Sequence, residues 1–233
     1  MLSNPPKTIL VADDEADMLQ LVGSTLRREG FTVVTAATGE TALEKVSEEH
    51  PDLAILDMMM PSGSGLEVCR AMRARPETAA IPVIMLSACS AEVDRVVAFE
   101  LGVDDYVTKP FSPRELVLRV KAILRYAGRS EPAEAAEEAW SVGAITLDRS
   151  PHHARVEGDE VWLTTIEFNL LRALMQMPGR VQSRHALMQE VWGGESVDPR
   201  TIDTQVRRLR AKLGSAAEQI ETVRSFGYRI AAR

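Results

Sequence analysis

The chain has 233 residues, of which 45% are hydrophobic and 26% are charged, and its formal net charge is −7. This length allows one large or two ordinary domains, and the composition is ordinary for a soluble globular protein. No secretory signal opens the sequence and no apolar run reaches the roughly 20 residues of a membrane helix, so we expect a cytoplasmic protein without membrane contact.

The first 126 residues alternate short apolar runs with amphipathic stretches. The apolar runs that predict buried strands lie at residues 9–12, 31–36, 53–56, 81–86 and 106–108. Apolar residues spaced three and four apart predict helices within residues 18–29, 39–49, 65–73, 91–101 and 112–126. Five strands that alternate with five helices indicate an α/β fold with a doubly wound, five-stranded parallel sheet.

Residues 127–138 are rich in Ala and Glu and contain no large apolar side chain, so they predict a linker that cannot bury a core. The charge balance also changes here. Residues 1–126 carry 13 Lys and Arg against 19 Asp and Glu, whereas residues 139–233 carry 13 against 11. We therefore predict a first domain at 1–126, a linker at 127–138 and a second domain at 139–233, with different partners for the two domains.

In the second domain the spacing of the apolar residues is different. Short strands are predicted between residues 142 and 163, and three helices follow at 166–177, 183–192 and 198–213. Residues 220–223 and 228–231 flank the turn Arg224-Ser225-Phe226-Gly227, which predicts a hairpin. Three helices closed by a hairpin indicate a winged helix-turn-helix, an α+β domain.

The helix predicted at 198–213 concentrates positive charge. Its expected buried stripe is formed by Ile202, Val206, Leu209 and Leu213. Arg207, Arg208 and Arg210 cannot all lie on that stripe, so some of them must face outward. An outward basic face suits the major groove of DNA. A merely solvated face is the alternative, but it explains Arg224 in the hairpin less well.

Polar side chains follow four of the predicted strands of the first domain. Asp13 and Asp14 follow the first, Asp57 the third, Ser87 the fourth and Lys109 the fifth. The carboxyl ends of such strands meet where doubly wound sheets bind ligands. Clustered carboxylates need a cation and suit Mg²⁺, whereas a hydroxyl and an ammonium suit phosphoryl oxygens. This edge therefore has the groups needed to form and hold an aspartyl phosphate.

Taken alone, each of these residues has a more ordinary explanation. Asp57 could cap a turn, the two adjacent acids could be solvated, and a Ser or Lys in a loop is usually incidental. All of them at the correct strand ends, with Pro110 directly after Lys109, are much harder to obtain by chance.

At these positions the chain resembles the receiver domain of two-component response regulators, over about residues 7–126. The resemblance implies a flavodoxin-like sheet and phosphorylation of Asp57 by a sensor histidine kinase. It also implies that Asp14, Asp57 and the backbone carbonyl of Met59 coordinate Mg²⁺, and that Asp13 assists directly or through water.

The same resemblance implies a switch next to the phosphorylated carboxylate. Ser87 and Lys109 would contact the phosphoryl oxygens, and Tyr106 would turn inward when Ser87 is drawn to them. The bond between Lys109 and Pro110 would be cis, which is rare enough to be a deliberate feature. Ser87 stands where Thr is commoner, an ordinary variation.

The resemblance further implies a two-fold homodimer that forms on phosphorylation. The residues of this dimer face would be Arg95, Glu100, Asp105, Glu115 and Arg119. Between chains, Arg95 would pair with Glu115, and Asp105 with Arg119. Glu100 lacks its expected arginine, for which Arg125 would have to substitute. Because Arg95, Glu115 and Arg119 fall off the apolar stripe of their helices, we expect them to face solvent.

Residues 139–233 resemble the DNA-binding domain of the OmpR/PhoB class of response regulators. The matching stretches are residues 165–171, 178–181, 200–203 with 207–210, and 222–229. The resemblance implies DNA contacts from the third helix and from the wing or its base. The helix residues are Arg200, Thr204, Gln205 and Arg208, and those of the wing are Thr222, Arg224 and Tyr228. Residues 188–198 would form a loop that can touch RNA polymerase.

We therefore expect a DNA-binding response regulator of a two-component system that acts at promoter repeats and is not an enzyme. One alternative is a dehalogenase-type phosphatase, which also forms an aspartyl phosphate. That class carries Asp-x-Asp, and here Met59 occupies the second acidic position. Another alternative is a constitutive DNA-binding protein with a vestigial receiver, against which the intact acidic residues and Lys109 argue.

Overall fold

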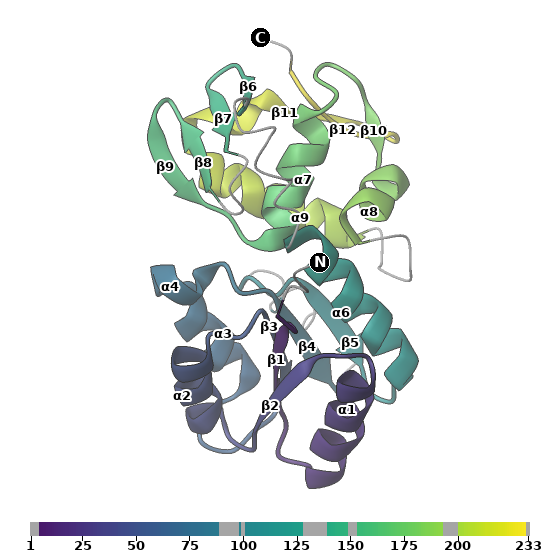
Figure 1. Cartoon of the computed structure of the whole chain (residues 1–233). Helices are drawn as coiled ribbons and strands as arrows, with labels where there is room; N and C mark the ends of the chain where they lie inside the picture. Colours follow the sequence, from purple (N-terminus) through teal and green to yellow (C-terminus); the bar gives the residue numbers. More distant parts are fainter. Residues whose placement is uncertain are drawn as a thin grey trace. The chain divides into compact units, whose positions relative to one another are not determined.

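The computed structural model describes residues 5–88, 98, 101–127, 139–148, 153–192 and 200–231. The chain divides into two compact units, Met1–Leu124 and Arg125–Arg233, each with its own buried core (Figure 1). In the part of the chain that the structure describes, every helix is too short or too polar to span a membrane.

The first unit contains the expected five-stranded parallel sheet. Its strands are β1 (Thr8–Ala12), β2 (Thr32–Ala36), β3 (Leu53–Asp57), β4 (Val83–Ser87) and β5 (Asp105–Thr108). Their order is β2-β1-β3-β4-β5. Every residue of β3 and β4 is buried, which explains why these strands are unbroken apolar runs without alternation. The strand order reverses between β1 and β3, so their carboxyl ends flank the crevice in which doubly wound sheets bind ligands.

Helices cover both faces of this sheet, as Figure 1 shows. They are α1 (Ala16–Arg28), α2 (Gly39–Glu49), α3 (Gly65–Arg73), α4 (Pro76–Ala79) and α6 (Pro113–Ala127). One core cluster contains side chains of α2 and α3, and the other contains side chains of α1 and α6. The four-residue α4 was not predicted, because one turn has no periodicity to detect. The helix predicted at 91–101 lies outside the described residues, apart from the fully buried Ala98 and the turn residue Leu101.

The second unit begins with a four-stranded antiparallel sheet. Its strands are β6 (Trp140–Val142), β7 (Ile145–Leu147), β8 (His153–Val156) and β9 (Asp159–Trp162). Three helices follow, α7 (Thr165–Met175), α8 (Arg184–Trp192) and α9 (Arg200–Leu213), and then a 3₁₀ helix at Gly214–Gln219. All residues of α7 are buried, so this helix is the centre of the unit.

A small three-stranded sheet closes the second unit. It has the order β10-β12-β11 and consists of β10 (Gln182–Ser183), β11 (Ile220–Val223) and β12 (Gly227–Ile230). The hairpin of β11 and β12 confirms the predicted wing, whereas β10 has only two residues and was not predicted. Gly227 is required where the strands meet, because a Cβ there would lie 2.0 Å from the backbone oxygen of Gln182.

Candidate functional site

The carboxyl edge of the first sheet brings two acids and one ammonium together. Asp57 is the last residue of β3, Asp13 directly follows β1, and Lys109 directly follows β5. The Nζ atom of Lys109 lies 2.7 Å from Asp57 Oδ1 and 2.8 Å from Asp13 Oδ2. Asp13 is fully buried and Asp57 is only 5% exposed. A single ammonium therefore joins two buried carboxylates from neighbouring strands.

Backbone donors fix both carboxylates. The N–H of Met59 donates to Asp57 Oδ2 at 2.9 Å, and the N–H of Glu15 donates to Asp13 Oδ1 at 2.9 Å. Each carboxylate thus uses one oxygen for the backbone and the other for Lys109. The loops after β1 and β3 orient both side chains before any ligand arrives.

The electrostatics of this edge keep Lys109 charged. Burial raises the pKa of Asp57 above its ordinary value, and the hydrogen bond and charge of Lys109 only partly oppose this effect. Burial alone would lower the pKa of Lys109, but its hydrogen bonds to Asp13 and Asp57 and their charges raise it above its ordinary value. The ammonium therefore stays protonated across the physiological range.

The edge has an excess of negative charge. Asp14 is exposed beside Asp13 and adds a third carboxylate, whereas Lys109 supplies one positive charge. Carboxylate and carbonyl oxygens are the ligands that Mg²⁺ takes, so the donors fit this ion in kind. In the part of the chain that the structure describes, no three His, Cys, Asp or Glu side chains are grouped as a metal cluster.

The strands β4 and β5 place Ser87 and Tyr106 next to this edge. Ser87 ends β4, which pairs with both β3 and β5, and it is only 2% exposed. Its hydroxyl donates to the sulfur of Met58 at 3.2 Å. Tyr106 is 8% exposed and belongs to the core cluster, so its ring is in an inward position. The peptide bond between Lys109 and Pro110 is cis, as expected.

The predicted dimer face differs from expectation at Arg119. The side chain of Arg119 is only 10% exposed, and its guanidinium lies 2.8 Å from Asp105 and 2.7 Å from Glu115 of the same chain. The prediction that Arg119 faces solvent is therefore wrong, because the buried Asp105 draws it inward. Glu115 is 39% exposed, in line with expectation. Arg95, Glu100 and the side chain of Arg125 lie outside the described residues.

The arginines of α9 point in different directions, as the sequence predicted. Arg207 lies on the exposed face of α9 together with Asp203, and Thr204 is half-buried. Gln205 is fully buried, which argues against the predicted DNA contact of this side chain. Gln205 lies beside the buried apolar stripe of α9. A resemblance to a family assigns a residue to a position in a motif, but it does not say whether the side chain is buried. The side chain of Arg200 lies outside the described residues.

Arg208 turns toward a buried acid instead of an open surface. Its side chain is 12% exposed, and its guanidinium lies 3.1 Å from Glu167 of α7, which is fully buried and also binds Lys212 at 2.6 Å. Burial would raise the pKa of Glu167, but the charges of Arg208 and Lys212 lower it below the ordinary value. In this conformation Arg208 neutralises Glu167, which argues against its predicted role as a DNA contact.

The wing carries two exposed predicted residues and one that serves as its anchor. Arg224 and Thr222 are exposed. Tyr228 is only 4% exposed, and its hydroxyl donates to Asp203 Oδ1 at 2.6 Å. Arg184, at the start of α8, donates to the same oxygen at 2.7 Å, and its guanidinium lies 5.0 Å from the Tyr228 ring centre. The acid Asp203 thereby ties α8, α9 and β12 together.

Sequence reasoning missed this network because its members have no recognisable spacing. Arg210, which was considered only as a basic residue, donates to Thr222 Oγ1 at 2.9 Å and to the backbone oxygen of Ile220 at 2.6 Å. It therefore braces the wing. The outward positive charge of α9 is smaller than its composition suggests, because Arg208 and Arg210 make internal contacts.

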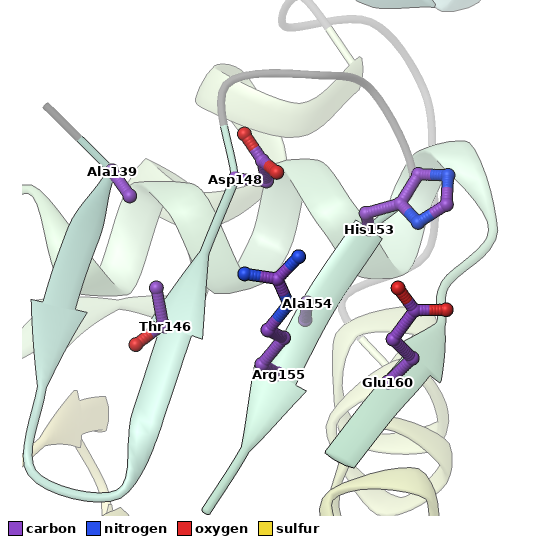
Figure 2. A pocket seen from close by; sticks show the side chains of 7 residues that line it. All are labelled: Ala139, Thr146, Asp148, His153, Ala154, Arg155 and Glu160. Atoms are coloured by element: carbon purple, nitrogen blue, oxygen red, sulfur yellow. The ribbon is translucent and has the colours of Figure 1, made fainter. Parts of the chain in front are cut away.

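The four-stranded sheet carries a separate small hollow of about 70 Å³. Figure 2 shows its polar lining from β7, β8 and β9 and the residue after β7, which includes Thr146, Asp148, His153, Arg155 and Glu160. The figure shows Arg155 between Asp148 and Glu160. The lining mixes two acids with Arg155 and His153, so this hollow does not resemble an anion site.

Comparisons with known proteins agree with both halves of this description. The family described as the response regulator receiver domain matches residues 9–121, and the one described as transcriptional regulatory protein, C terminal, matches residues 158–230. The transcriptional regulatory protein ResD of Bacillus subtilis (strain 168) is 44% identical over 229 residues, which cover 95% of this chain and 94% of that protein. The chain is a response regulator of the OmpR/PhoB class.

Further relatives support this assignment. The phosphate regulon regulator PhoB of Rhizobium meliloti (strain 1021) is 46% identical over 226 residues, covering 96% of this chain and 97% of that protein. The crystal structure of DrrB, a Thermotoga maritima OmpR/PhoB homologue, is similar with 32% identity and a TM-score of 0.51, covering 97% of this chain and 99% of DrrB. This response regulator therefore belongs to a two-component system, binds DNA and regulates transcription.

Proposed function

We propose that this response regulator accepts a phosphoryl group on Asp57 from a sensor histidine kinase in the cytoplasm. The observation that carries the proposal is the buried pair of Asp13 and Asp57 on the Lys109 ammonium. A carboxylate oxygen of Asp57 attacks phosphorus, an O–P bond forms, and the P–N bond of the phosphohistidine breaks with its electron pair going to the imidazole. Lys109 then balances charge on the phosphoryl oxygens.

Mg²⁺ would be held by Asp13, Asp14, Asp57 and the backbone carbonyl of Met59. When bound, it supplies positive charge to the phosphoryl oxygens. The support is the donor set and the excess of carboxylates over ammonium at this edge. The backbone N–H of Met59 already holds Asp57 Oδ2, so the carboxylate is oriented in advance.

The proposed switch involves Ser87 and Tyr106. The Ser87 hydroxyl would leave the sulfur of Met58 and donate to a phosphoryl oxygen. Tyr106 is already inward in the described structure, so phosphorylation would stabilise this position rather than create it. The dimer face next to it comprises Asp105, Glu115 and Arg119 of the described residues, with Arg95 and Glu100 beyond them.

For DNA, the proposed surface consists of the outward side of α9 and the wing. Its residues are Arg200, Thr204, Arg207, Thr222 and Arg224. Gln205 and Arg208 are left out because of their burial, and Tyr228 acts as the wing anchor. The regulator would bind promoter repeats as a homodimer, and residues 188–198 would contact RNA polymerase.

The test of the phosphorylation site is labelling with acetyl phosphate in Mg²⁺. Asp57→Asn should abolish the label, because no carboxylate remains at the site. The matched control is Asp52→Asn, which removes an acid that precedes the same strand and binds Lys7 at 2.7 Å. Asp52→Asn should label normally. Label of equal amount and stability on Asp57→Asn would disprove the assignment.

A further inference from the structure

The hydroxyl of Ser87 contacts a thioether beside the proposed phosphorylation site. Its Oγ atom donates to the sulfur of Met58 at 3.2 Å. Met58 directly follows Asp57 at the end of β3, and Ser87 ends the neighbouring strand β4. A thioether is a weak hydrogen-bond acceptor, so this contact holds the hydroxyl less firmly than a carbonyl or a carboxylate would.

The backbone around Met58 fixes the position of this thioether. The Met58 N–H donates to the carbonyl of Leu86 at 2.8 Å, and the Met58 carbonyl accepts from the N–H of Gly65 at 3.2 Å. Gly65 is the first residue of α3, and a Cβ on it would lie 2.2 Å from the backbone oxygen of Asp57. The loop after β3 is therefore held between β4 and α3, next to Ser87.

The backbone of Ser87 is fixed as well. Ser87 is the last residue of the buried strand β4, and its carbonyl accepts from the N–H of Lys109 at 2.7 Å. Its hydroxyl can change position by rotation of the side chain between staggered conformations. A move of the hydroxyl from the Met58 sulfur to a phosphoryl oxygen on Asp57 therefore breaks one specific contact while the strand pairing is kept.

Loss of this contact opposes the proposed switch. An interaction that is present in only one of two states favours that state by its own free energy. The single hydroxyl hydrogen of Ser87 cannot be donated fully to the Met58 sulfur and to a phosphoryl oxygen at once. The contact between Ser87 and Met58 therefore belongs to the unphosphorylated regulator and stabilises it.

Packing is a second role of Met58, and it can be separated from the first. Met58 is partly buried against the core cluster that contains Met72 and Tyr106. An apolar side chain of similar volume, such as Leu, would fill the same space at little cost in stability. It would not offer an acceptor to Ser87. Replacement by Leu therefore removes the sulfur and keeps the packing.

We infer that Met58 is a positioning residue of the switch, whose sulfur holds the Ser87 hydroxyl in the unphosphorylated regulator and so limits the response to a phosphoryl group on Asp57. This inference rests on the proposed function, in which Asp57 is the acceptor and Ser87 contacts the phosphoryl oxygens. It adds that Met58 acts through Ser87. A chain without the sulfur should bind a phosphoryl group more tightly, and only while the Ser87 hydroxyl is present.

The test measures the binding of beryllofluoride, a non-covalent mimic of the phosphoryl group, to the full chain in Mg²⁺ by fluorine NMR. Met58→Leu should lower Kd about threefold, because a hydrogen bond to a weak acceptor is lost from the beryllofluoride-free chain alone. Met58→Ile also lacks the acceptor and should shift Kd in the same direction. In a chain that carries Ser87→Ala, addition of Met58→Leu should leave Kd unchanged.

Met72→Leu is the matched control, because it makes the same replacement in the same core cluster. Met72 is 1% exposed, and the next residue, Arg73, donates to the carbonyl of Ile81 ahead of β4. This is the opposite end of the strand from Ser87. Met72→Leu should bind beryllofluoride as wild type does, and urea unfolding shows whether each variant is folded.

Three outcomes would overturn the inference. They are equal or weaker binding by Met58→Leu, tighter binding that persists without the Ser87 hydroxyl, and equally tight binding by Met72→Leu. If the wild-type chain binds no beryllofluoride at all, the proposed phosphorylation site itself fails. That result is distinguishable from failure of the Met58 inference alone, in which wild-type binding persists.

Discussion

Arg119 pairs with Asp105 of its own chain at 2.8 Å, and the carboxylate of Asp105 is only 2% exposed. A second hydrogen bond, from the backbone N–H of Tyr106 at 2.8 Å, holds the other oxygen of Asp105. An ion pair that was expected to join two chains is thus already formed within one. Variants of Arg119 will therefore change the stability of the first unit as well as any dimer.

The first prediction concerns that stability. Arg119→Ala should lower the free energy of unfolding by about 3 kcal/mol, because it removes the counter-charge of a buried carboxylate. Arg114→Ala, an exposed arginine of the same helix, is the control and should change it by less than about 0.5 kcal/mol. Urea unfolding of the full chain measures both. Equal urea midpoints for Arg119→Ala and Arg114→Ala would show that the buried Asp105 does not need Arg119 as its counter-charge.

The second prediction separates pairing within a chain from pairing between chains. The double variant Arg119→Asp with Asp105→Arg restores opposite charges in either case and should dimerise with itself when phosphorylated. If the pairs exchange between chains, mixed dimers of wild type and this variant place like charges together and should be rare. Because the structure pairs Asp105 and Arg119 within one chain, we expect mixed dimers at the statistical share in sedimentation of labelled chains. Mixed dimers well below that share would show that the pairs exchange between chains on phosphorylation.

The third prediction uses the raised pKa of Asp57. Burial favours the protonated carboxyl in the folded state, so ionisation of Asp57 lowers stability as pH rises from the ordinary pKa of 3.8 through the raised one. Asp57→Asn should therefore increase Tm at pH 7, and this gain should vanish below pH 3.8. Calorimetry at both pH values provides the measurement. A gain that is independent of pH would mean that the carboxylate charge is not its cause.

The fourth prediction concerns the wing anchor. Burial and the hydrogen bond to Asp203 raise the pKa of Tyr228 to about 12. Because this value exceeds the ordinary 10.0, the protonated phenol stabilises the fold fully below pH 10, and the contribution is lost as pH rises toward 12. Ultraviolet titration should show a late-titrating tyrosine component that is lost in Tyr228→Phe. Asp203→Asn should shift its titration toward pH 10, and an unchanged titration would contradict the anchor.

The fifth prediction tests the roles of the two arginines on α9. Arg207→Ala should reduce the salt slope of DNA binding by about one, since it lies on the exposed face of α9. Arg208→Ala should chiefly destabilise the second unit, because Glu167 loses one of its two cations. Filter binding and thermal unfolding together give both numbers. If instead Arg208→Ala keeps full stability and loses the salt slope, Arg208 leaves Glu167 to bind DNA.

The fold could be predicted from the sequence because each strand and helix has a recognisable local pattern of apolar residues. Asp13, Asp57, Ser87 and Lys109 could be placed at one edge because each directly follows a predicted strand, and parallel strands align their carboxyl ends. Short elements such as α4 and β10 have too few residues for a period to be visible.

Side-chain partners across long separations were not predictable in the same way. Arg208 and Glu167 lie on different helices, so only the packing of α7 against α9 shows that they neutralise each other. Asp203, which was not considered, became a central acid because Arg184 and Tyr228 converge on it from two other elements. The burial of Gln205 likewise follows from packing around α9 and not from its residue type.

The ammonium that joins Asp13 and Asp57 is part of the polypeptide, and this has a consequence for the living cell. A tethered counter-ion does not dilute, so Lys109 keeps the two acids together however little free magnesium the medium holds. The unphosphorylated regulator is expected to keep the arrangement of its acidic residues when magnesium is scarce. Phosphoryl transfer to Asp57 would then be the step that depends on the supply of magnesium. The fold of the domain that carries Asp57 would not depend on it.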